Sequence, residues 1–239
     1  PMINAPEAIQ ALENWVASLQ YSPPEVLTYG FDELQAAFIS GRCAMEINWT
    51  DVGRVGSNPT VSQVVGKIGV GLVPGFQLPD GNILHRPVLA AGRVMSITKT
   101  CKAPELAFEI LRLMALDASL AYVSSSYAGM DPFRISHFET PEAFGMFSSY
   151  EEAKEYLDGV RLNIELGYPE LTMQGSAQYM DILSLALSQA LAKQKTPQEA
   201  LDWAASEWNK ITDSLGRDIQ KQYYQSLIQS WKENGYWFD

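Results

Sequence analysis

Residues 36–49 read AAFISGRCAMEINW, and the pattern of this stretch changes halfway along it. Apolar residues recur at helical spacing over 31–41, and a glycine closes that run, so we predict a short helix there. Residues 43–49 instead alternate in polarity from one position to the next, which predicts a strand. Asn48 and Trp49 then lie at the end of this strand.

The segments that follow continue this alternation of helix and strand. Residues 67–75, KIGVGLVPG, predict a second strand, PDG at 79–81 is a turn signal, and VMSIT at 94–98 predicts a third strand. Two S/T-x-x-E boxes, beginning at Ser149 and Thr196, mark the starts of later helices. Three short strands among many helices predict a layered α/β fold. The helices predicted before residue 125 cover 5–20, 31–41, 103–115 and 117–124.

Charge and hydropathy exclude several classes of partner. The 239-residue chain has 28 acidic and 17 basic residues, a net charge of −11. Such a surface repels nucleic-acid phosphates and anionic lipid headgroups, so we expect no nucleic-acid partner. The 46% of apolar residues can build one large core or two modest ones. The sequence contains no stretch of the roughly 18 apolar residues that a membrane span needs, and no recognisable signal segment.

The sequence offers no metal site and no cofactor motif. Cys43 and Cys101 lack any CxxC spacing, and we expect no bridge between them. His85 and His137 stand far apart in the chain without a neighbouring cysteine. GxSxG, Walker A, HExxH and EF-hand patterns are absent, so acyl-transfer, P-loop and zincin chemistry lack their usual signatures. We therefore expect neither a metal nor a cofactor.

Trp49 is the most informative single residue of the chain. An aromatic side chain at the end of a strand lies at the edge of a sheet, where α/β proteins bind ligands. The apolar C–H face of a sugar can stack on its indole, a contact of about 1 kcal/mol. A core position fits Trp49 equally well, as we expect for Trp15, Trp203 and Trp208 from their helical spacing.

A polar, turn-rich loop, SSSYAGMDPFR at 124–134, offers further candidates. Tyr127, Asp131 and Arg134 bring a phenol, a carboxylate and a guanidinium into one segment, which suits hydrogen bonding to sugar hydroxyls. A connector between two helices, turning at an Asp-Pro pair, fits this loop equally well. Tyr179 begins an amphipathic helix, and packing on the preceding chain is slightly favoured over a place in a cleft.

Several segments, read in order, resemble family-one extracellular solute-binding proteins, which include maltodextrin-binding and related sugar-binding proteins. The resemblance spans roughly residues 30–212 and rests on AAFISGRCAMEINW, KIGVGLVPG, the segment from VLAAG to APELAFEILRLM, GMDPFR, AQYMDIL and TPQEALDWAASEWNKI. It implies an α/β fold of the periplasmic-binding-protein (Venus-flytrap) type II, with a helix-rich C-terminal lobe and a partial segment of the N-terminal lobe.

The resemblance also implies a division of the chain. Residues 1–86 are then the first part of the C-terminal lobe, 87–134 an excursion belonging to the N-terminal lobe, and 135–239 the helical remainder of the C-terminal lobe. The family's full chains are longer, so we expect the sheet of the N-terminal lobe to be missing. The helix at 103–115 then keeps an apolar stripe uncovered, and we expect self-association or repacking of 87–134.

The function implied by the resemblance is binding without chemistry. The protein holds a short saccharide or polyol in an interlobe cleft and delivers it to the permease subunits of an ABC importer, from an extracytoplasmic location. An acidic sugar stays open, because Arg134 can pair with a carboxylate. Matched position by position, the ligand contacts that the resemblance implies are Asn48, Trp49, Tyr127, Asp131, Arg134 and Tyr179.

Two functions of other classes also stay open. Glycoside-processing enzymes need two carboxylates a fixed distance apart in space, and Glu46, Asp51 and Asp131 are candidates for such a pair. A helical interaction module is the other alternative, because the second half of the chain is rich in helix. In that case Trp49 has only a structural role.

Overall fold

The computed structural model describes residues 2–89, 94–116, 118–125, 127 and 130–235. The chain divides into two compact units. Unit 1 is Pro1–Gly30 with Pro169–Asp239, and unit 2 is Phe31–Tyr168. Across the described ranges, none of the helices combines the length and the apolar character that crossing a membrane requires.

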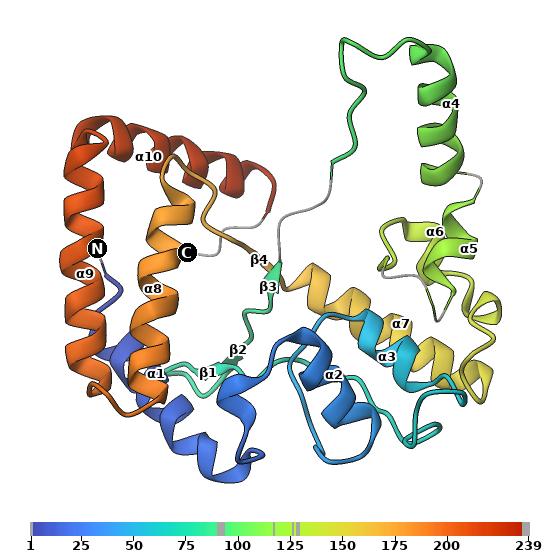
Figure 1. Ribbon diagram of the computed structural model, residues 1–239, viewed down its shortest axis with the longest axis horizontal. Coiled ribbons are helices and arrows are strands. Elements are labelled where there is room, and N and C mark those ends of the chain that lie inside the picture. Colours follow the sequence, from blue (N-terminus) through green and yellow to red (C-terminus); the bar gives the residue numbers. More distant parts are fainter. Residues whose placement is uncertain (1, 90–93, 117, 126, 128–129, 236–239) are drawn as a thin grey trace. The chain divides into compact units, whose positions relative to one another are not determined.

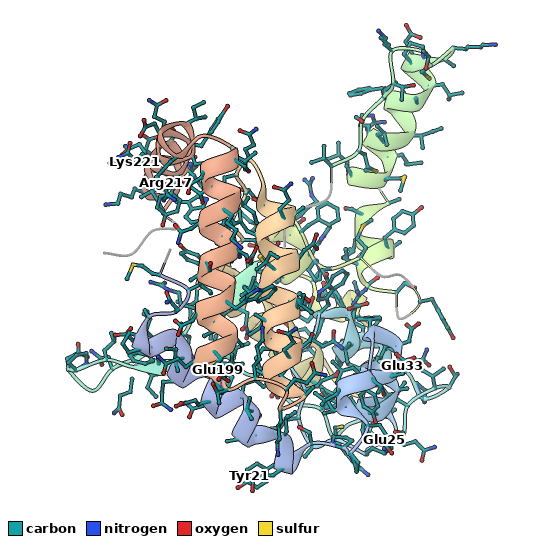
Figure 2. The ribbon with its side chains drawn as sticks, turned by 60° about the vertical axis from the view of Figure 1, so that its left-hand side comes forward. Tyr21, Glu25, Glu33, Glu199, Arg217 and Lys221 are labelled. Atoms are coloured by element: carbon teal, nitrogen blue, oxygen red, sulfur yellow. The ribbon has the colours of Figure 1, made fainter. Side chains whose placement is uncertain are left out.

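Unit 1 is built from helices around the neighbouring pair α8 (Ser176–Leu191) and α9 (Pro197–Ser214), which lie side by side in Figures 1 and 2. Four of the six residues buried in its core are alanines, and their small side chains let the helices approach closely. The core residues are Leu12, Ala186, Ala190, Ala200, Leu201 and Ala204. The elements are α1 (Pro6–Ser18), η1 (Leu19–Tyr21), η2 (Val26–Thr28), α8 (Ser176–Leu191), α9 (Pro197–Ser214) and α10 (Arg217–Glu233).

Local signals in the sequence account for the start of α9. The hydroxyl of Thr196 accepts the amide of Glu199 at 3.2 Å, and the Glu199 carboxylate accepts the amide of Thr196 at 2.9 Å. These two bonds satisfy free amides of the first helical turn. Figure 2 labels Glu199 there, and it labels Arg217 on α10, whose guanidinium pairs with Asp213 at 2.7 Å. The capping box predicted at Thr196 is confirmed.

Unit 2 has its core on α7 (Tyr150–Glu165). This helix buries Tyr156 and Leu157 against Val123 and Phe144 from other parts of the unit. Its start is capped by Ser149, whose hydroxyl accepts the amide of Glu152 at 3.1 Å, as the S/T-x-x-E box predicts. The other helices are α2 (Phe31–Ile39), α3 (Asp51–Gly56), α4 (Pro104–Ala115), α5 (Ser119–Val123), α6 (Ile135–Phe138) and η3 (Pro141–Ala143).

The strands predicted over 43–49, 67–75 and 94–98 are wrong, because no strand forms in these segments. Alternating polarity favours an extended backbone, but a strand also needs a neighbour that completes its ladder of hydrogen bonds. The described residues instead pair four strands of two residues each. They are β1 (Phe76–Gln77), β2 (Ile83–Leu84), β3 (Val88–Leu89) and β4 (Tyr168–Pro169).

The turn predicted at PDG is confirmed. β1 and β2 form an antiparallel hairpin in which Phe76 faces Leu84. Within its loop, Asp80 accepts the amide of Asn82 at 3.0 Å, and Gly81 has a φ of +89°. That backbone conformation is open to glycine without strain.

The positions of helices were predicted from the sequence more accurately than the burial of individual residues. The helices predicted over 5–20, 31–41 and 103–115 form as α1, α2 and α4, although Trp15 of α1 is 49% exposed and the core position predicted for it is wrong. α1 buries Leu12 instead, one turn away. Cys43 and Cys101 are half-buried free thiols.

α4 buries none of its residues. Its apolar stripe is open to solvent, with Leu106 63%, Ile110 50% and Leu113 49% exposed. Figure 1 shows α4 apart from α7, whereas Val123, at the end of α5, lies in the core around α7. The uncovered stripe is confirmed, and the self-association expected from it stays a prediction.

Candidate functional site

The candidate site lies in unit 2, where the chain enters α3. The side-chain carbonyl of Asn48 accepts the amide of Trp49 at 2.8 Å, and its amide nitrogen donates to Glu46 at 3.4 Å. Such local side-chain bonds fix a non-helical turn before a helix begins. Asn48 therefore sets the direction in which Trp49 leaves the backbone.

Trp49 is exposed rather than buried. Its ring is 54% accessible, and its centroid lies 5.9 Å from that of Phe31, with the two planes tilted by 50°. Phe31 is itself 43% exposed. The core interpretation of Trp49 is therefore wrong, and the two rings form an exposed aromatic pair.

Asp131 reaches the start of α3 although it is 81 positions away from Thr50 in the chain. The Thr50 hydroxyl donates a hydrogen bond to the Asp131 carboxylate. The guanidinium of Arg54 lies 3.8 Å from the same carboxylate oxygen. The structure thus brings one of the predicted loop residues to Thr50, the residue that follows Trp49 in the chain.

Tyr156 supports this site from α7. Its hydroxyl donates to the backbone carbonyl of Thr50 at 3.0 Å, and burial raises the pKa of Tyr156 to about 12. The phenol therefore stays protonated and keeps its role as a donor. A Cβ atom on Gly53 would lie 2.8 Å from the Tyr156 ring, so only glycine allows this close packing.

Asp51 interacts electrostatically with both of the other candidate carboxylates, Glu46 and Asp131. Burial raises the pKa of Glu46, and the neighbouring charge of Asp51 raises it further. The pKa of Asp51 is likewise raised, first by burial and then by the charge of Asp131. These shifts are expected where carboxylates share a poorly solvated region. Asp51 therefore links Glu46 and Asp131 electrostatically, and the three residues are called the acidic cluster below.

The remaining predicted residues are distributed differently. Tyr127 is 80% exposed, and hydrogen bonds from Asn58 and Thr60 lower the pKa of its phenol. Arg134 donates to the carbonyl of Ala115, at the end of α4, at 3.3 Å. Residues 126, 128 and 129 of the predicted loop lie outside the described residues.

Tyr179 belongs to unit 1 and is only 4% exposed. Its hydroxyl bonds to Thr212 at 2.8 Å, and its ring meets Trp208 edge to face at 5.4 Å. The Trp208 indole also donates to the Tyr179 carbonyl at 2.8 Å. These contacts agree with the packing that the sequence slightly favoured for Tyr179, which is not part of the cluster in unit 2.

Sequence reasoning missed Phe31, Thr50, Arg54 and Tyr156. The spacing of Thr50 and Arg54 contained a signal, because positions i and i+4 share one face of a helix. Tyr156 had no such signal, since its contact with Thr50 joins segments 106 positions apart. Within the described ranges, no three His, Cys, Asp or Glu side chains are grouped to hold a metal ion.

Comparison with known proteins identifies the family. The sequence profile described as bacterial extracellular solute-binding protein matches residues 2–120. Residues 2–120 belong to this family. The segments that suggested the resemblance, from AAFISGRCAMEINW to APELAFEILRLM, lie within that match.

A solved structure confirms the fold of this chain. Maltose-bound MalE3 of T. maritima superimposes with a TM-score of 0.71 over 87% of the chain, at 22% sequence identity. The predicted fold, a type II periplasmic-binding fold rich in helix, is confirmed. The chain covers 51% of that structure, about half its length.

Proposed function

We propose that this chain binds a short saccharide or a polyol, as the substrate-binding component of an ABC importer. The observation that carries the proposal is the exposed pair of Trp49 and Phe31 next to the hydrogen-bonded group of Thr50 and Asp131. Asn48 and Tyr127 complete the proposed ligand site. Membership of residues 2–120 in a solute-binding family supports this choice.

A sugar matches both halves of this site. Its C–H face is apolar and stacks on an aromatic ring, with a gain of about 1 kcal/mol for a contact of this kind. Its hydroxyls donate to a carboxylate such as Asp131, which carries several acceptor positions. A polyol offers the same hydroxyls without the flat ring, and a long oligosaccharide would need more exposed rings than Trp49 and Phe31.

The proposal extends to the whole transport process. The lobe division implied by the resemblance, with 1–86 and 135–239 in one lobe and 87–134 in the other, is part of this proposal. A protein of this kind delivers its ligand unchanged to permease subunits in the membrane, and it works outside the cytoplasm. Arg134 takes part in the ligand site only for an acidic sugar.

Calorimetric titration with a panel of sugars and polyols tests the proposal. We expect binding of at least one among maltose, glucose, galactose and sorbitol at millimolar concentration. Trp49→Ala should weaken that binding by about tenfold, because a stacked aromatic anchor is lost. Trp15→Ala is the matched control, since Trp15 is similarly exposed but belongs to unit 1. A complete absence of binding across the panel would contradict the proposal.

A glycoside-processing enzyme is the second candidate, and the acidic cluster favours it. Raised pKa values at Glu46 and Asp51 are a feature of general acids. Incubation with a panel of chromogenic glycosides separates the two functions. The binding proposal expects no turnover, whereas turnover that Asp131→Asn abolishes would establish the enzyme.

A further inference from the structure

We propose that Arg54 is the positioning residue of this site. It fastens the end of α5 and the carboxylate of Asp131 to α3, and thereby holds Asp131 beside Trp49 in the arrangement that binds ligand. The part of this inference that concerns the ligand rests on the proposed function. The fastening itself concerns only contacts within unit 2.

The burial of Arg54 calls for an explanation. Its side chain is fully buried, and a buried charge is strongly unfavourable unless it finds partners. One nitrogen, Nη1, donates to the carbonyls of Val123 at 2.7 Å and Ser125 at 3.0 Å. These carbonyls lie at the end of α5, where a helix leaves acceptors unused. Arg54 therefore joins α3 to a segment about 70 positions further along the chain.

The second connection of Arg54 runs to the ligand side. Its Nη2 lies 3.8 Å from the Asp131 oxygen that also accepts the Thr50 hydroxyl. Thr50 stands four positions before Arg54, so both partners of Asp131 come from one face at the start of α3. Asp131 is thus held at two points, and both depend on α3.

Stability alone does not account for this arginine. Nε and Nη2 are buried and form no hydrogen bond with the described residues. Incompletely satisfied buried charges are often matched or exceeded in stability by apolar side chains of similar volume. What an apolar side chain cannot do is hold two backbone carbonyls and one carboxylate in fixed directions, which the forked guanidinium does.

α3 is a firm anchor for these contacts. Tyr156 donates to the carbonyl of Thr50 at 3.0 Å and packs on Gly53. Tyr156 itself belongs to the buried core of unit 2. A displacement of α3 would therefore disturb that core. Val123 is also buried in this core, and Arg54 adds polar contacts to the carbonyl of Ser125 and to Asp131.

Arg54→Lys tests the fastening, because lysine keeps the charge and loses the fork. Hydrogen exchange followed by mass spectrometry should show amides of 119–125 exchanging about tenfold faster, as expected when a charge-assisted hydrogen bond is lost. Exchange in α8 and α9 of unit 1 should stay unchanged. The matched control is Arg161→Lys on the exposed face of α7, where the guanidinium bonds Glu165 at 2.7 Å. Unchanged exchange at 119–125 in a folded Arg54→Lys variant would overturn the proposal.

Titration with maltose, glucose, galactose and sorbitol tests the positioning. Arg54→Lys should bind about tenfold more weakly any probe that the wild type binds, because one charge-assisted contact is lost. Arg161→Lys should bind that probe with wild-type affinity. Faster exchange at 119–125 together with wild-type affinity would overturn the positioning role. If the wild type binds no probe but Arg54→Lys still exchanges faster at 119–125, the proposed function is rejected. The structural contacts assigned to Arg54 are then still supported.

A second variant covers the case in which Arg54→Lys does not fold. Thr50→Val removes one of the two partners of Asp131 and leaves Arg54 and its carbonyl contacts in place. Exchange should then rise at 130–134 and stay unchanged at 119–125. Equally faster exchange in both segments would contradict a division in which Arg54, and not Thr50, supplies the polar contacts to the end of α5.

Discussion

The α8–α9 pair of unit 1 and the α3–α5 region of unit 2 are held together by different means. α8 and α9 are neighbours in sequence, and their interface consists of buried alanines such as Ala186 and Ala204. α3 and α5 are far apart in sequence, and a buried charge, Arg54, connects them. Short-range packing of small residues defines the first region, and long-range polar contacts define the second.

The two regions are therefore expected to respond differently to mutation. An interface of alanines tolerates little change in volume and offers no exposed polar group for a ligand. The α3 region carries exposed rings, an incompletely hydrogen-bonded arginine in its interior and an acidic cluster, which are features of binding sites. We therefore expect mutations in unit 1 to affect unfolding alone, and mutations around α3 to affect unfolding and binding together.

The largest expected effect is on the core of unit 2. Leu157 is fully buried on α7, and Leu157→Ala should lower the free energy of unfolding of unit 2 by about 3 kcal/mol, through lost burial and a cavity. Amide exchange in α7 measures it. Leu162→Ala, 43% exposed on the same helix, should lower it by under about 1 kcal/mol. If exchange in α8 and α9 rose equally, the two units would not unfold separately, and the comparison between them would fail.

Overpacking the alanine interface is the next largest effect. Ala204 is fully buried in unit 1, and Ala204→Leu should destabilise that unit by about 2 kcal/mol, since the added carbons have no space between the helices. Amide exchange in α8 and α9 measures the change. Ser206→Leu, at an exposed position of α9, should stay within about 0.5 kcal/mol of the wild type. Equal effects at the two positions would show that α8 and α9 do not pack closely.

Removal of a helix cap should have a smaller effect. Thr196→Ala removes the hydroxyl that accepts the Glu199 amide, and should destabilise unit 1 by about 1 kcal/mol in a urea titration. Ser149→Ala removes the corresponding bond in unit 2. Each cap joins residues three positions apart, so we expect the two substitutions to lower the free energy of unfolding by similar amounts. A much larger loss at Ser149 would show that the start of α7 depends on contacts beyond its cap.

The stability of unit 2 should also depend on pH through His137. The Phe133 amide donates to Nδ1 at 3.3 Å, and Nε2 lies 3.0 Å from the Ser119 hydroxyl, so the neutral ring fits its place. Burial, followed by the charge of Arg134, lowers the pKa of His137. The unfolded chain then takes up a proton at a higher pH, near 6.5, than the folded chain does.

The stability of unit 2 is therefore expected to fall as pH drops below about 6.5, and to be fully present above it. Urea titrations at several pH values measure this slope. His137→Gln should flatten it, because the glutamine side chain does not titrate. An identical slope in wild type and His137→Gln would assign the pH dependence to other groups.

The sequence predicted local features well and pairing poorly. Helix starts at Ser149 and Thr196 were readable because a cap involves residues three positions apart. The strands at 43–49 and 67–75 were not, because alternation describes one segment and a ladder requires two. Trp15 was misplaced for a related reason, since helical spacing identifies a face but not how deep each residue lies in it.

Only some residues of the candidate site could be predicted from the sequence. Trp49 and Asp131 were recognised by residue type and by their position at a predicted strand end and in a turn-rich loop. Their association was not, because Thr50 and Asp131 meet across 81 positions of chain. Arg54 was overlooked for the same reason, since its role depends on carbonyls of Val123 and Ser125 that no pattern around position 54 announces.

By itself, the sequence determined many of the helices, their caps, the family resemblance and several residues of the candidate site. Each of these depends on interactions within a few positions of chain or on an ordered series of segments. Only the tertiary structure decided that Trp49 is exposed, that Glu46, Asp51 and Asp131 form one cluster, and that Arg54 links α3 to α5. Burial and electrostatic contact depend on distances in space, and folding sets these distances between segments whose separation in sequence carries no information about them.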